Sequence, residues 1–381
     1  MRKILKKIFP IILLKRGFLL YNQIKTLTLD AILFDEYVPN QNELIHHYSE
    51  NPFIRVGIDV HTFTANVQEG FLRWLNPSWT QDQYIVKIQS KEIYIEGKSG
   101  WGVINGRKLI YYSLGFARAP HVHKPTIKEF VFKVRNEVYL PKVISLRDTG
   151  EENYFHFYND VIPKLFLLED YHLLNEDYHL VVSHKLWDKP YFQFFIEAAN
   201  LKSLKWFVQR QEWIKSNEVI FCKPLTHSKN YLIRMSNIML KNVLEMTPRR
   251  VFLTRKKESL RYLENEDEVY GLLSQYGFEK IDTAKLTIEE QISIFYSATD
   301  IIALHGAGIT NIIFRKGKPL RILEIFHDNE YLPFHYPMLS ALFNFTYSAI
   351  RGYRGRQANA GGFKVDMNEI SSFCEINYSK N

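Results

Sequence analysis

The alternation of helical patterns with short apolar runs, from about Glu152 to Ile325, constrains this chain most. Such alternation is typical of βαβ units and predicts a parallel sheet covered by helices. The strands are expected at 218–222, 250–254, 278–282, 301–304 and 321–325, and the helices at 232–244, 266–276, 287–298 and 309–314. Ligands of open parallel sheets bind beyond the carboxyl ends of the strands, so residues at these ends are the candidate binding residues.

Two of the helices carry start signals. Asn265 and Glu268 form a capping-box-like pair, and Thr287 and Glu290 have the same spacing. The region from about 53 to 146 follows a different pattern, with β-like runs at 84–89, 92–96 and 108–113 separated by glycines. We therefore expect a β-rich N-terminal portion that departs from an ideal Rossmann pattern.

The positive charge is concentrated at the amino terminus. The 381 residues have a net charge of +8, and seven Lys or Arg residues precede the first acid, Asp30. Because these cations lie beside an apolar run at 8–14, residues 1–25 are predicted to contact an anionic membrane surface rather than nucleic acid. A basic helix that packs on the protein itself is the alternative. The run is too short to span a bilayer and does not resemble a secretory signal.

The two cysteines, Cys222 and Cys374, lie far apart and form no Cys/His cluster, which excludes a disulfide framework and a structural zinc site. This usage favours a reducing compartment. His121 and His123 could ligate a metal, but no third ligand is evident nearby, and a loop is the preferred interpretation.

The segment His305-Gly-Ala-Gly-Ile-Thr-Asn311 follows a predicted buried strand and opens a predicted helix. Glycines there allow the backbone to approach a phosphate, and the helix start offers free N–H groups and a positive dipole end. Tight strand-to-helix packing is the alternative explanation. The segment lacks the third glycine of a dinucleotide fingerprint, and the chain contains neither a GxSxG serine elbow nor a P-loop.

Two arginines and one acid lie close to the end of the strand at 250–254. Arg255 and Arg261 could hold a diphosphate and stabilise its charge as it leaves, or could belong to a solvated basic loop. Glu268 is either the partner in the cap or an acceptor for a ribose hydroxyl.

His156 and Asp160 lie four residues apart within 152–169, which is predicted to be a helix with a polar insertion. This spacing places both side chains on one face, and a histidine oriented by a carboxylate can take a proton from a hydroxyl nucleophile. A surface pair or a buried structural histidine has the same spacing. Asp160 or Glu152 could instead be the base.

These stretches together resemble glycosyltransferase family 61, over about 151–327. The resemblance rests on Tyr154-Phe-His-Phe-Tyr-Asn-Asp160 with Pro163, on Thr254, Arg255, Arg261 and 265–268, on 304–314, and on 323–325. It implies a GT-B architecture, with two Rossmann-like domains facing across a cleft, and inverting transfer of a sugar from a nucleotide donor, commonly UDP-linked. It also implies an acceptor that is a saccharide or a lipid-linked saccharide. Without a spanning anchor, the chain is similar to bacterial-type members of surface or capsular polysaccharide assembly, peripheral at the cytoplasmic face of the membrane.

No Asp-x-Asp pair occurs in the sequence, so we expect neither a metal nor another cofactor, with arginines and a helix start neutralising the diphosphate. The predicted catalytic residues are His156 and Asp160. The predicted donor-binding residues are Arg255, Arg261, Glu268, His305, Gly306, Ala307, Gly308, Asn311 and Glu324.

The predicted segments are a membrane-surface stretch at 1–40, an acceptor-side domain at 41–215, a nucleotide-sugar domain at 216–350 and a tail or helix at 351–381. Two other functions stay open. One is an NAD(P) oxidoreductase of the Rossmann type, with Glu324 or Asp328 as the ribose-binding acid, and the other is a non-catalytic membrane-surface scaffold.

Overall fold

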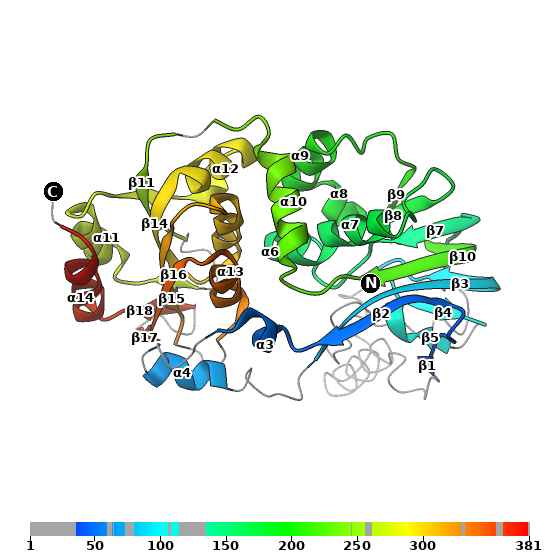
Figure 1. Cartoon of the computed structure of the whole chain (residues 1–381), viewed down its shortest axis with the longest axis horizontal. Coiled ribbons are helices and arrows are strands. Elements are labelled where there is room, and N and C mark those ends of the chain that lie inside the picture. Colours follow the sequence, from blue (N-terminus) through cyan, green and yellow to red (C-terminus); the bar gives the residue numbers. More distant parts are fainter. Residues whose placement is uncertain are drawn as a thin grey trace, which may run out of the picture.

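The computed structural model describes residues 36–58, 63, 65–72, 80–105, 108–113, 135–244, 246–255, 261–328, 332–355 and 361–379. The predicted membrane segment at 1–25 and the pair His121 and His123 lie outside these ranges. Two α/β units lie side by side, each on its own sheet (Figure 1). The mixed α/β class predicted from the sequence is therefore confirmed.

The N-terminal unit is built on a ten-stranded sheet with the order β1-β5-β4-β3-β10-β7-β8-β9, in which β2 also pairs with β3 and β6 with β10. Its strands are β1 (Glu36–Tyr37), β2 (Leu44–Glu50), β3 (Gln81–Ile95), β4 (Gly102–Ile104), β5 (Lys108–Ile110), β6 (Glu137–Tyr139), β7 (Lys142–Ser145), β8 (His179–Ser183), β9 (Trp206–Gln209) and β10 (Trp213–Lys223). Strands β10, β7, β8 and β9 run parallel, and β3 joins them by antiparallel pairing with β10. The β-rich portion is thus an antiparallel extension of a parallel sheet.

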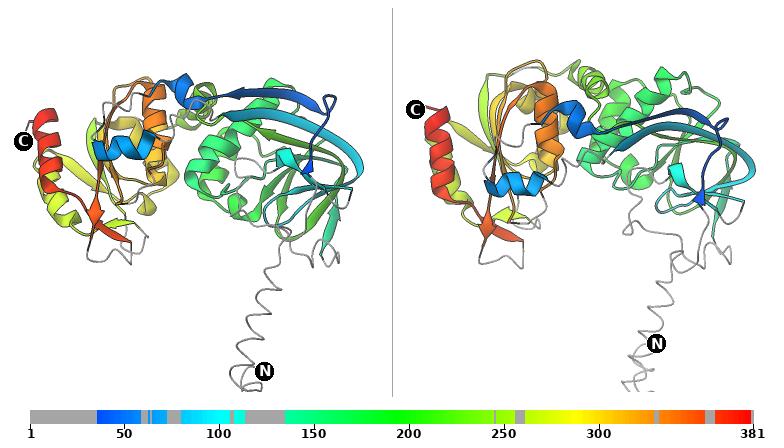
Figure 2. Two further views of the ribbon diagram at one scale, coloured as in Figure 1. Left: turned by 90° about the horizontal axis from the view of Figure 1, so that it is seen from below. Right: turned by 60° about the horizontal axis from the view of Figure 1, so that its bottom comes forward.

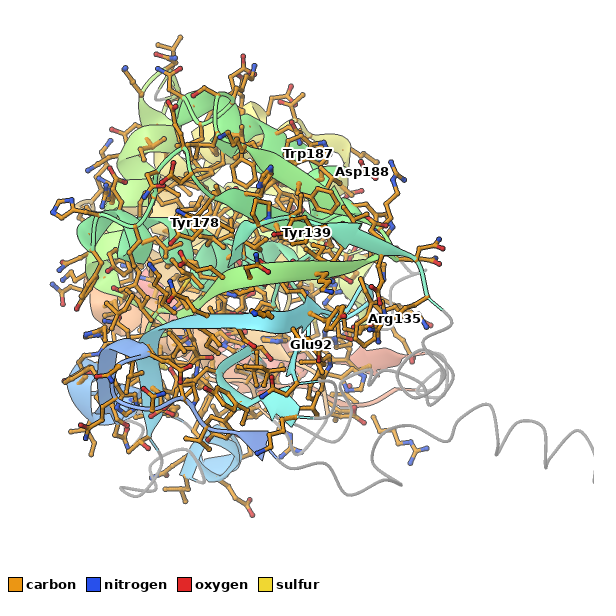
Figure 3. The ribbon with its side chains drawn as sticks, turned by 90° about the vertical axis from the view of Figure 1, so that its right-hand side faces the viewer. Glu92, Arg135, Tyr139, Tyr178, Trp187 and Asp188 are labelled. Carbon is orange, nitrogen blue, oxygen red and sulfur yellow. The ribbon has the colours of Figure 1, made fainter. Side chains whose placement is uncertain are left out.

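The strands predicted at 84–89 and 92–96 are one continuous strand, β3. Its register against β10 shifts between the pairs Ser216–Ile93 and Glu218–Gln89, where β3 has two more residues than β10. An irregularity in β3 itself therefore accommodates the polar stretch between the two apolar runs. At the end of this sheet seen in Figure 3, the guanidinium of Arg135 lies 4.0 Å from the ring centre of Trp213 and 4.7 Å from that of Tyr94. These cation–π contacts cover the aromatic rings at the strand ends.

The predicted helix at 152–169 consists of three consecutive helical segments. Its α-helical parts, α6 (Tyr154–His156) and α7 (Ile162–Asp170), flank a π-helical turn, η5 (Phe157–Val161). Such π-turns are rare and occur frequently at functional sites. The other helical segments of this unit are η4 (Tyr111–Ser113), α8 (His184–Trp187), α9 (Pro190–Ala198) and the connecting helix α10 (Lys229–Leu240).

The C-terminal unit contains a five-stranded parallel sheet with the order β13-β11-β14-β15-β16. Its strands are β11 (Arg249–Leu253), β13 (Phe278–Ile281), β14 (Ala298–Leu304), β15 (Arg321–Phe326) and β16 (Thr346–Arg351), and a smaller sheet contains β12 (Tyr262–Leu263), β17 (Tyr353–Arg354) and β18 (Gly362–Lys364). Its helical segments are α11 (Glu266–Ser274), η6 (Thr283–Lys285), α12 (Ile288–Ser297), η7 (Ala307–Arg315), α13 (His335–Phe343) and α14 (Met367–Asn377). The four strands predicted in this unit are present, and β16 was not predicted.

Two predictions about helix starts have different outcomes. Thr287 and Glu290 form a complete capping box, with each side chain accepting from the other residue's backbone N–H at 3.2 and 2.7 Å. The cap predicted for Asn265 and Glu268 is wrong, because the Asn265 side chain exchanges two hydrogen bonds with the Val365 backbone instead. A long-range contact has replaced the local one.

An early segment of the chain packs on the C-terminal unit. Helices α3 (Pro52–Val56) and α4 (Ala65–Leu72) lie along the lower side of that unit in Figure 1 and next to it in both views of Figure 2, whereas β2 and β3 extend into the other unit. Phe53 contacts Phe334, and Phe71 contacts Phe326, with ring centres 4.9 and 5.7 Å apart. The domain boundaries predicted from the sequence stay predictions, and this crossing was not among them.

One hydrophobic cluster continues from the first unit into the second. It includes Ile144 of β7 and Ile220 of β10 together with Val251 of β11 and Ile301 of β14. Helix α10 and the helical turns at 154–170 and 307–315 lie in this shared core. Within the described ranges, no helix combines the length and the apolar character that crossing a bilayer requires.

Candidate active site

A cavity of about 410 Å³ lies where β11, β13 and β14 end in the C-terminal unit. Its wall includes Thr254, Arg255, Asp282 and the turn 306–308. We call it the donor cavity. The sequence predicted a binding site at these strand ends, and the volume is in the range of small-molecule sites.

The glycine turn and Arg255 pack directly against each other in this cavity. Arg255 Nη1 donates to the carbonyl oxygen of His305 at 2.7 Å. A Cβ added to Gly306 would lie 2.7 Å from the same nitrogen, so a side chain there would displace the guanidinium. Gly308 is also tight, since its Cβ would lie 3.2 Å from Leu253 Cδ2. The glycines therefore allow close approach of the arginine and of any ligand to the backbone.

The helix predicted after this turn is a 3₁₀-helix, η7, rather than an α-helix. It is nine residues long, whereas such helices rarely exceed three or four residues. The first N–H groups of a helix have no intrahelical acceptor, and Ala307 and Gly308, the first residues of η7, lie in the cavity wall. The anion-binding role predicted for the turn stays a prediction, now at the start of a tighter helix.

His305 is oriented from behind by a buried acid. Its Nδ1 hydrogen-bonds to Oε1 of Glu324, which is fully buried, and the other oxygen of Glu324 accepts from the Tyr347 hydroxyl. Both carboxylate oxygens are thus occupied inside the protein. Glu324 thus orients His305, and its predicted role in donor binding stays a prediction.

Arg255 and Arg261 lie close enough to influence each other electrostatically. Burial and the neighbouring charge of Arg261 lower the pKa of Arg255. Both guanidinium groups also act on Tyr336, whose hydroxyl donates to the carbonyl oxygen of Gly306 at 2.7 Å. Two positive charges therefore lie beside the glycine turn, as a diphosphate site would require.

Two predicted donor-binding residues lie elsewhere. Asn311 is fully buried, and its Oδ1 accepts from the hydroxyl of Tyr154 in the N-terminal unit at 2.6 Å. It joins the two units. Glu268 is exposed on the first turn of α11, whereas Glu266 of that turn accepts from Thr254, next to Arg255. The predicted roles of Asn311 and Glu268 in donor binding stay predictions.

The His156 and Asp160 side chains are hydrogen-bonded, with Nδ1 and Oδ2 2.6 Å apart. The other Asp160 oxygen accepts from Asn159 at 2.8 Å. Burial acts against protonation of His156, but the hydrogen bond and charge of Asp160, with the charges of Asp148 and Glu152, outweigh it and raise the pKa of His156. The imidazole thus has a fixed orientation, and Nε2 is the ring nitrogen that can exchange a proton with a ligand.

His335, at the start of α13, lies between the two groups of predicted residues. Its ring centre is 6.3 Å from that of His156 and 4.2 Å from that of Phe155. Burial lowers the pKa of His335 well below its usual value, and the charges of His227, His156 and His305 act in the same direction. Because His335 interacts with both His156 and His305, it marks the place where the predicted base and the donor cavity approach each other.

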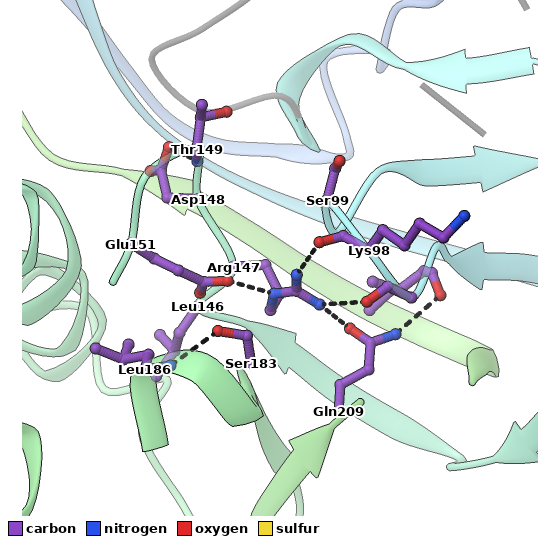
Figure 4. Close-up of polar contacts among 12 residues, drawn as sticks. Lys98, Ser99, Leu146, Arg147, Asp148, Thr149, Glu151, Ser183, Leu186 and Gln209 are labelled. Carbon is purple, nitrogen blue, oxygen red and sulfur yellow. Dashed lines mark hydrogen bonds and ion pairs between the residues drawn. The ribbon is translucent and has the colours of Figure 1, made fainter. Parts of the chain in front are cut away.

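A buried ionic network holds the loop that follows β7. Lys164 of α7 is almost fully buried, and its ammonium group contacts Asp148 Oδ2 at 2.9 Å and the Arg147 carbonyl at 2.8 Å. Arg147 donates to Glu151 at 2.8 Å, to the Lys98 carbonyl at 2.8 Å and to Gln209 (Figure 4). The network fixes Asp148, and with it part of the negative charge around His156.

Sequence reasoning missed His335, Tyr336, Arg147, Asp148 and Lys164. Arg147 and Asp148 carried the one usable signal, because charged residues directly after an apolar strand are candidates at a sheet edge. His335 and Lys164 have no such signal. Their roles follow from contacts with residues distant in the sequence.

Comparisons with known proteins support a glycosyltransferase. The beta-1,2-xylosyltransferase XAX1 of Oryza sativa subsp. japonica is 26% identical over 288 residues, which cover 65% of this chain and 50% of that protein. The chain thus spans about half the length of this curated relative.

Residues 154–320 match the model of the family Glycosyltransferase 61. This match and the plant relative support that family for the chain, as the sequence resemblance predicted. The matched range contains His156, Asp160, Arg255 and the glycine turn.

One solved structure with a detectable likeness is the dodecameric iron-containing heptosyltransferase TibC in complex with ADP-D-beta-D-heptose. The likeness has a TM-score of 0.33 and 12% identity over 71% of this chain and 80% of that one. A likeness of this degree supports no argument about the present chain.

Proposed function

We propose that the protein is an inverting glycosyltransferase that moves a sugar from a UDP-linked donor to a saccharide or lipid-linked saccharide in surface polysaccharide biosynthesis. The observation that carries the proposal is the proximity of two groups across the units. The wall of the donor cavity contains Arg255 and the first residues of η7, and His156 lies beside His335, whose pKa is also lowered by the charge of His305. We propose further that the two units act as a GT-B pair.

In the proposed reaction an acceptor hydroxyl attacks the anomeric carbon from the face opposite the nucleotide. His156 Nε2 takes the hydroxyl proton as the new C–O bond forms and the bond to the diphosphate breaks. The electron pair of that bond goes to the diphosphate, whose added charge is stabilised by Arg255, Arg261 and the N–H groups of the turn. No cofactor takes part in the proposed step.

Asp160 stabilises the imidazolium that forms on His156, because their hydrogen bond strengthens as the ring becomes charged. Asp160 itself and Glu152 are the other candidate bases, and Glu152 acts on His156 through its charge. The His156 assignment is preferred because its Nδ1 is held and its second nitrogen faces away from that bond.

A ligand panel tests the proposed class of enzyme. Thermal unfolding of the full chain is measured with UDP, other nucleoside diphosphates, NAD and NADP. A ligand at about 100 times its Kd stabilises a protein by about 2.7 kcal/mol. We expect stabilisation by a nucleoside diphosphate. Stabilisation by NAD or NADP alone would favour an oxidoreductase, and a response to none of the ligands would favour the scaffold.

We propose that residues 1–25 hold the enzyme at the inner face of the membrane. Deleting them should release the protein from anionic vesicles and leave the fold intact, and high salt should act similarly because it screens Lys and Arg. Co-sedimentation with vesicles measures both effects. Binding that survives deletion and salt would place the membrane contact elsewhere.

A further inference from the structure

A second cavity, of about 380 Å³, lies in the N-terminal unit, where β7, β8 and β9 end. Its wall includes Arg147, Glu151, Glu152, His184, Lys185 and Arg210. We call it the N-terminal cavity. It occupies the same position relative to its parallel strands as the donor cavity does in the other unit, which is where open sheets bind ligands.

This cavity adjoins the proposed base. Gly150, in its wall, has a φ of +72°, and a Cβ added there would lie 3.3 Å from His156 Cδ2. Asp148 and Glu152, also in the wall, act electrostatically on His156. The loop that forms this part of the wall therefore packs directly against the His156 ring.

The charges of the wall are not balanced at its rim. Arg147 is paired with Glu151 at 2.8 Å and Asp148 with Lys164 at 2.9 Å, all four being buried. Lys185 and Arg210 are exposed, and the wall carboxylate outside the buried pairs is that of Glu152. The carboxylate of Glu212 accepts from the backbone N–H groups of Arg210 and Gln211, and its charge also interacts with that of Arg210.

The inner wall has hydrogen-bonding capacity that the described part of the chain does not use. Glu151 Oε2 and His184 Nδ1 are buried and have no hydrogen-bond partner among the described residues. Glu151 is 3% exposed. Leaving such atoms unpaired is unfavourable, so a ligand whose hydroxyl groups reach them would gain from the new hydrogen bonds.

We propose that the N-terminal cavity binds the acceptor and that this acceptor is an acidic saccharide. Lys185 and Arg210 hold its anionic group, a carboxylate or a phosphate, while Glu151 and His184 receive its hydroxyl groups and the reacting hydroxyl meets His156. The inference rests on the proposed function and adds the substrate class and its residues.

Binding without donor tests the inference separately from the reaction. The probes are a disaccharide that ends in glucuronate, the same disaccharide with its carboxylate reduced to an alcohol, and glucose 1-phosphate. Each is titrated into the full chain by calorimetry, and UDP is titrated in parallel. The variants are Lys185→Glu and Arg210→Glu, with Lys91→Glu, an exposed residue of β3, as the control of equal charge change.

We expect the acidic disaccharide or glucose 1-phosphate to bind at least tenfold more tightly than the reduced form, and whichever binds identifies the anionic group. Lys185→Glu and Arg210→Glu should each weaken that binding about tenfold, with unchanged thermal stability and UDP affinity, whereas Lys91→Glu should have no effect. Equal affinity for charged and reduced forms, no binding of any probe, or indifference to both variants would overturn the inference. Acidic-saccharide binding by a chain that does not bind UDP would retain the site and refute the proposed transfer.

Discussion

The two cavities occupy equivalent positions at the ends of parallel strands, but their walls are built differently. The wall of the donor cavity contains the backbone turn at 306–308, which packs closely against Arg255. The wall of the N-terminal cavity is held mainly by charged side chains, through ion pairs such as Arg147 with Glu151 and Lys164 with Asp148. A site built from backbone groups suits a group, such as a phosphate, that is the same in all ligands of the site. A site built from side chains can acquire a different ligand when those side chains are substituted.

The largest expected effect is on kcat, and it should separate proton transfer at His156 from nucleotide binding in the donor cavity. His156→Ala should lower kcat by about 10²–10⁴, the usual contribution of a general base, and leave nucleotide affinity nearly unchanged. Asp160→Asn should give a smaller loss, because the ring keeps a hydrogen-bonding neighbour of the same shape. Steady-state transfer kinetics and UDP titration measure the two quantities. A variant that keeps native turnover would direct attention to Asp160 or Glu152.

The second prediction concerns the ionic wall of the N-terminal cavity. Lys164→Met should lower the free energy of unfolding by about 3–5 kcal/mol, because it leaves Asp148 buried without its counter-charge. Urea unfolding provides the measurement. The control is Lys202→Met, whose ion pair with Glu197 is exposed and should contribute less than about 1 kcal/mol. Similar losses in both variants would show that the buried pair is dispensable.

The third prediction concerns the donor cavity. Arg255→Ala should weaken nucleotide binding about tenfold to a hundredfold, because a charge-assisted phosphate contact is worth about 1.5–3 kcal/mol. Its effect on folding should be small, since Arg255 is only half-buried. Arg234→Ala, on α10 and paired with Glu169 and Asp170, is the control for charge removal. Unchanged UDP affinity in a folded Arg255→Ala variant would remove this arginine from the site.

The smallest expected effect is a shift in pH dependence. A base must be neutral, so turnover should rise with pH through the raised pKa of His156. Asp160→Asn removes the partner that raises this pKa, while burial still lowers it, so the acidic limb of the rate profile should move to lower pH. If the acidic limb of the Asp160→Asn profile stays at the same pH, it reflects the titration of a group other than His156.

The same linkage predicts how stability changes. A raised folded-state pKa of His156 contributes stability that is present below its unfolded value of 6.5 and is lost as pH rises through the folded value. Asp160→Asn should therefore lower the melting temperature more at about pH 6 than at about pH 9. A loss that is equal at both values would mean that the bond stabilises the fold independently of protonation.

The contrast between the cavities also explains what could be predicted from the sequence. The strands of the C-terminal unit, the glycine turn and the pair His156 and Asp160 are local patterns, and each is found where it was predicted. Lys164, by contrast, is a cation within an apolar helix, and its partner Asp148 is recognisable only once the loop after β7 folds back onto α7. Local reasoning therefore finds backbone sites more readily than sites assembled from distant charges.

The wrong prediction of a cap at Asn265 also arises from a partner that is distant in the sequence. Asn265 has a residue type and position suited to capping, but Val365 offers its backbone as a partner and takes the side chain away. Glu324 and Asn311 also have partners distant in the sequence, since they accept hydrogen bonds from Tyr347 and Tyr154, and their predicted roles in donor binding stay predictions. Closeness in sequence to the glycine turn identified residues near the donor cavity. It did not show which of their side chains face the cavity and which bind other side chains inside the protein.

The placement of α3 and α4 has a consequence for how the protein could be divided or recombined. Because Phe53, Val67 and Phe71 complete a hydrophobic cluster of the C-terminal unit, a fragment that begins after β10 would expose Phe326 and Met338 to water. The C-terminal unit is thus not formed by one contiguous stretch of sequence. Transferring it to another protein, as a modular exchange of units would require, means carrying residues 52–72 along as a second, separate insert.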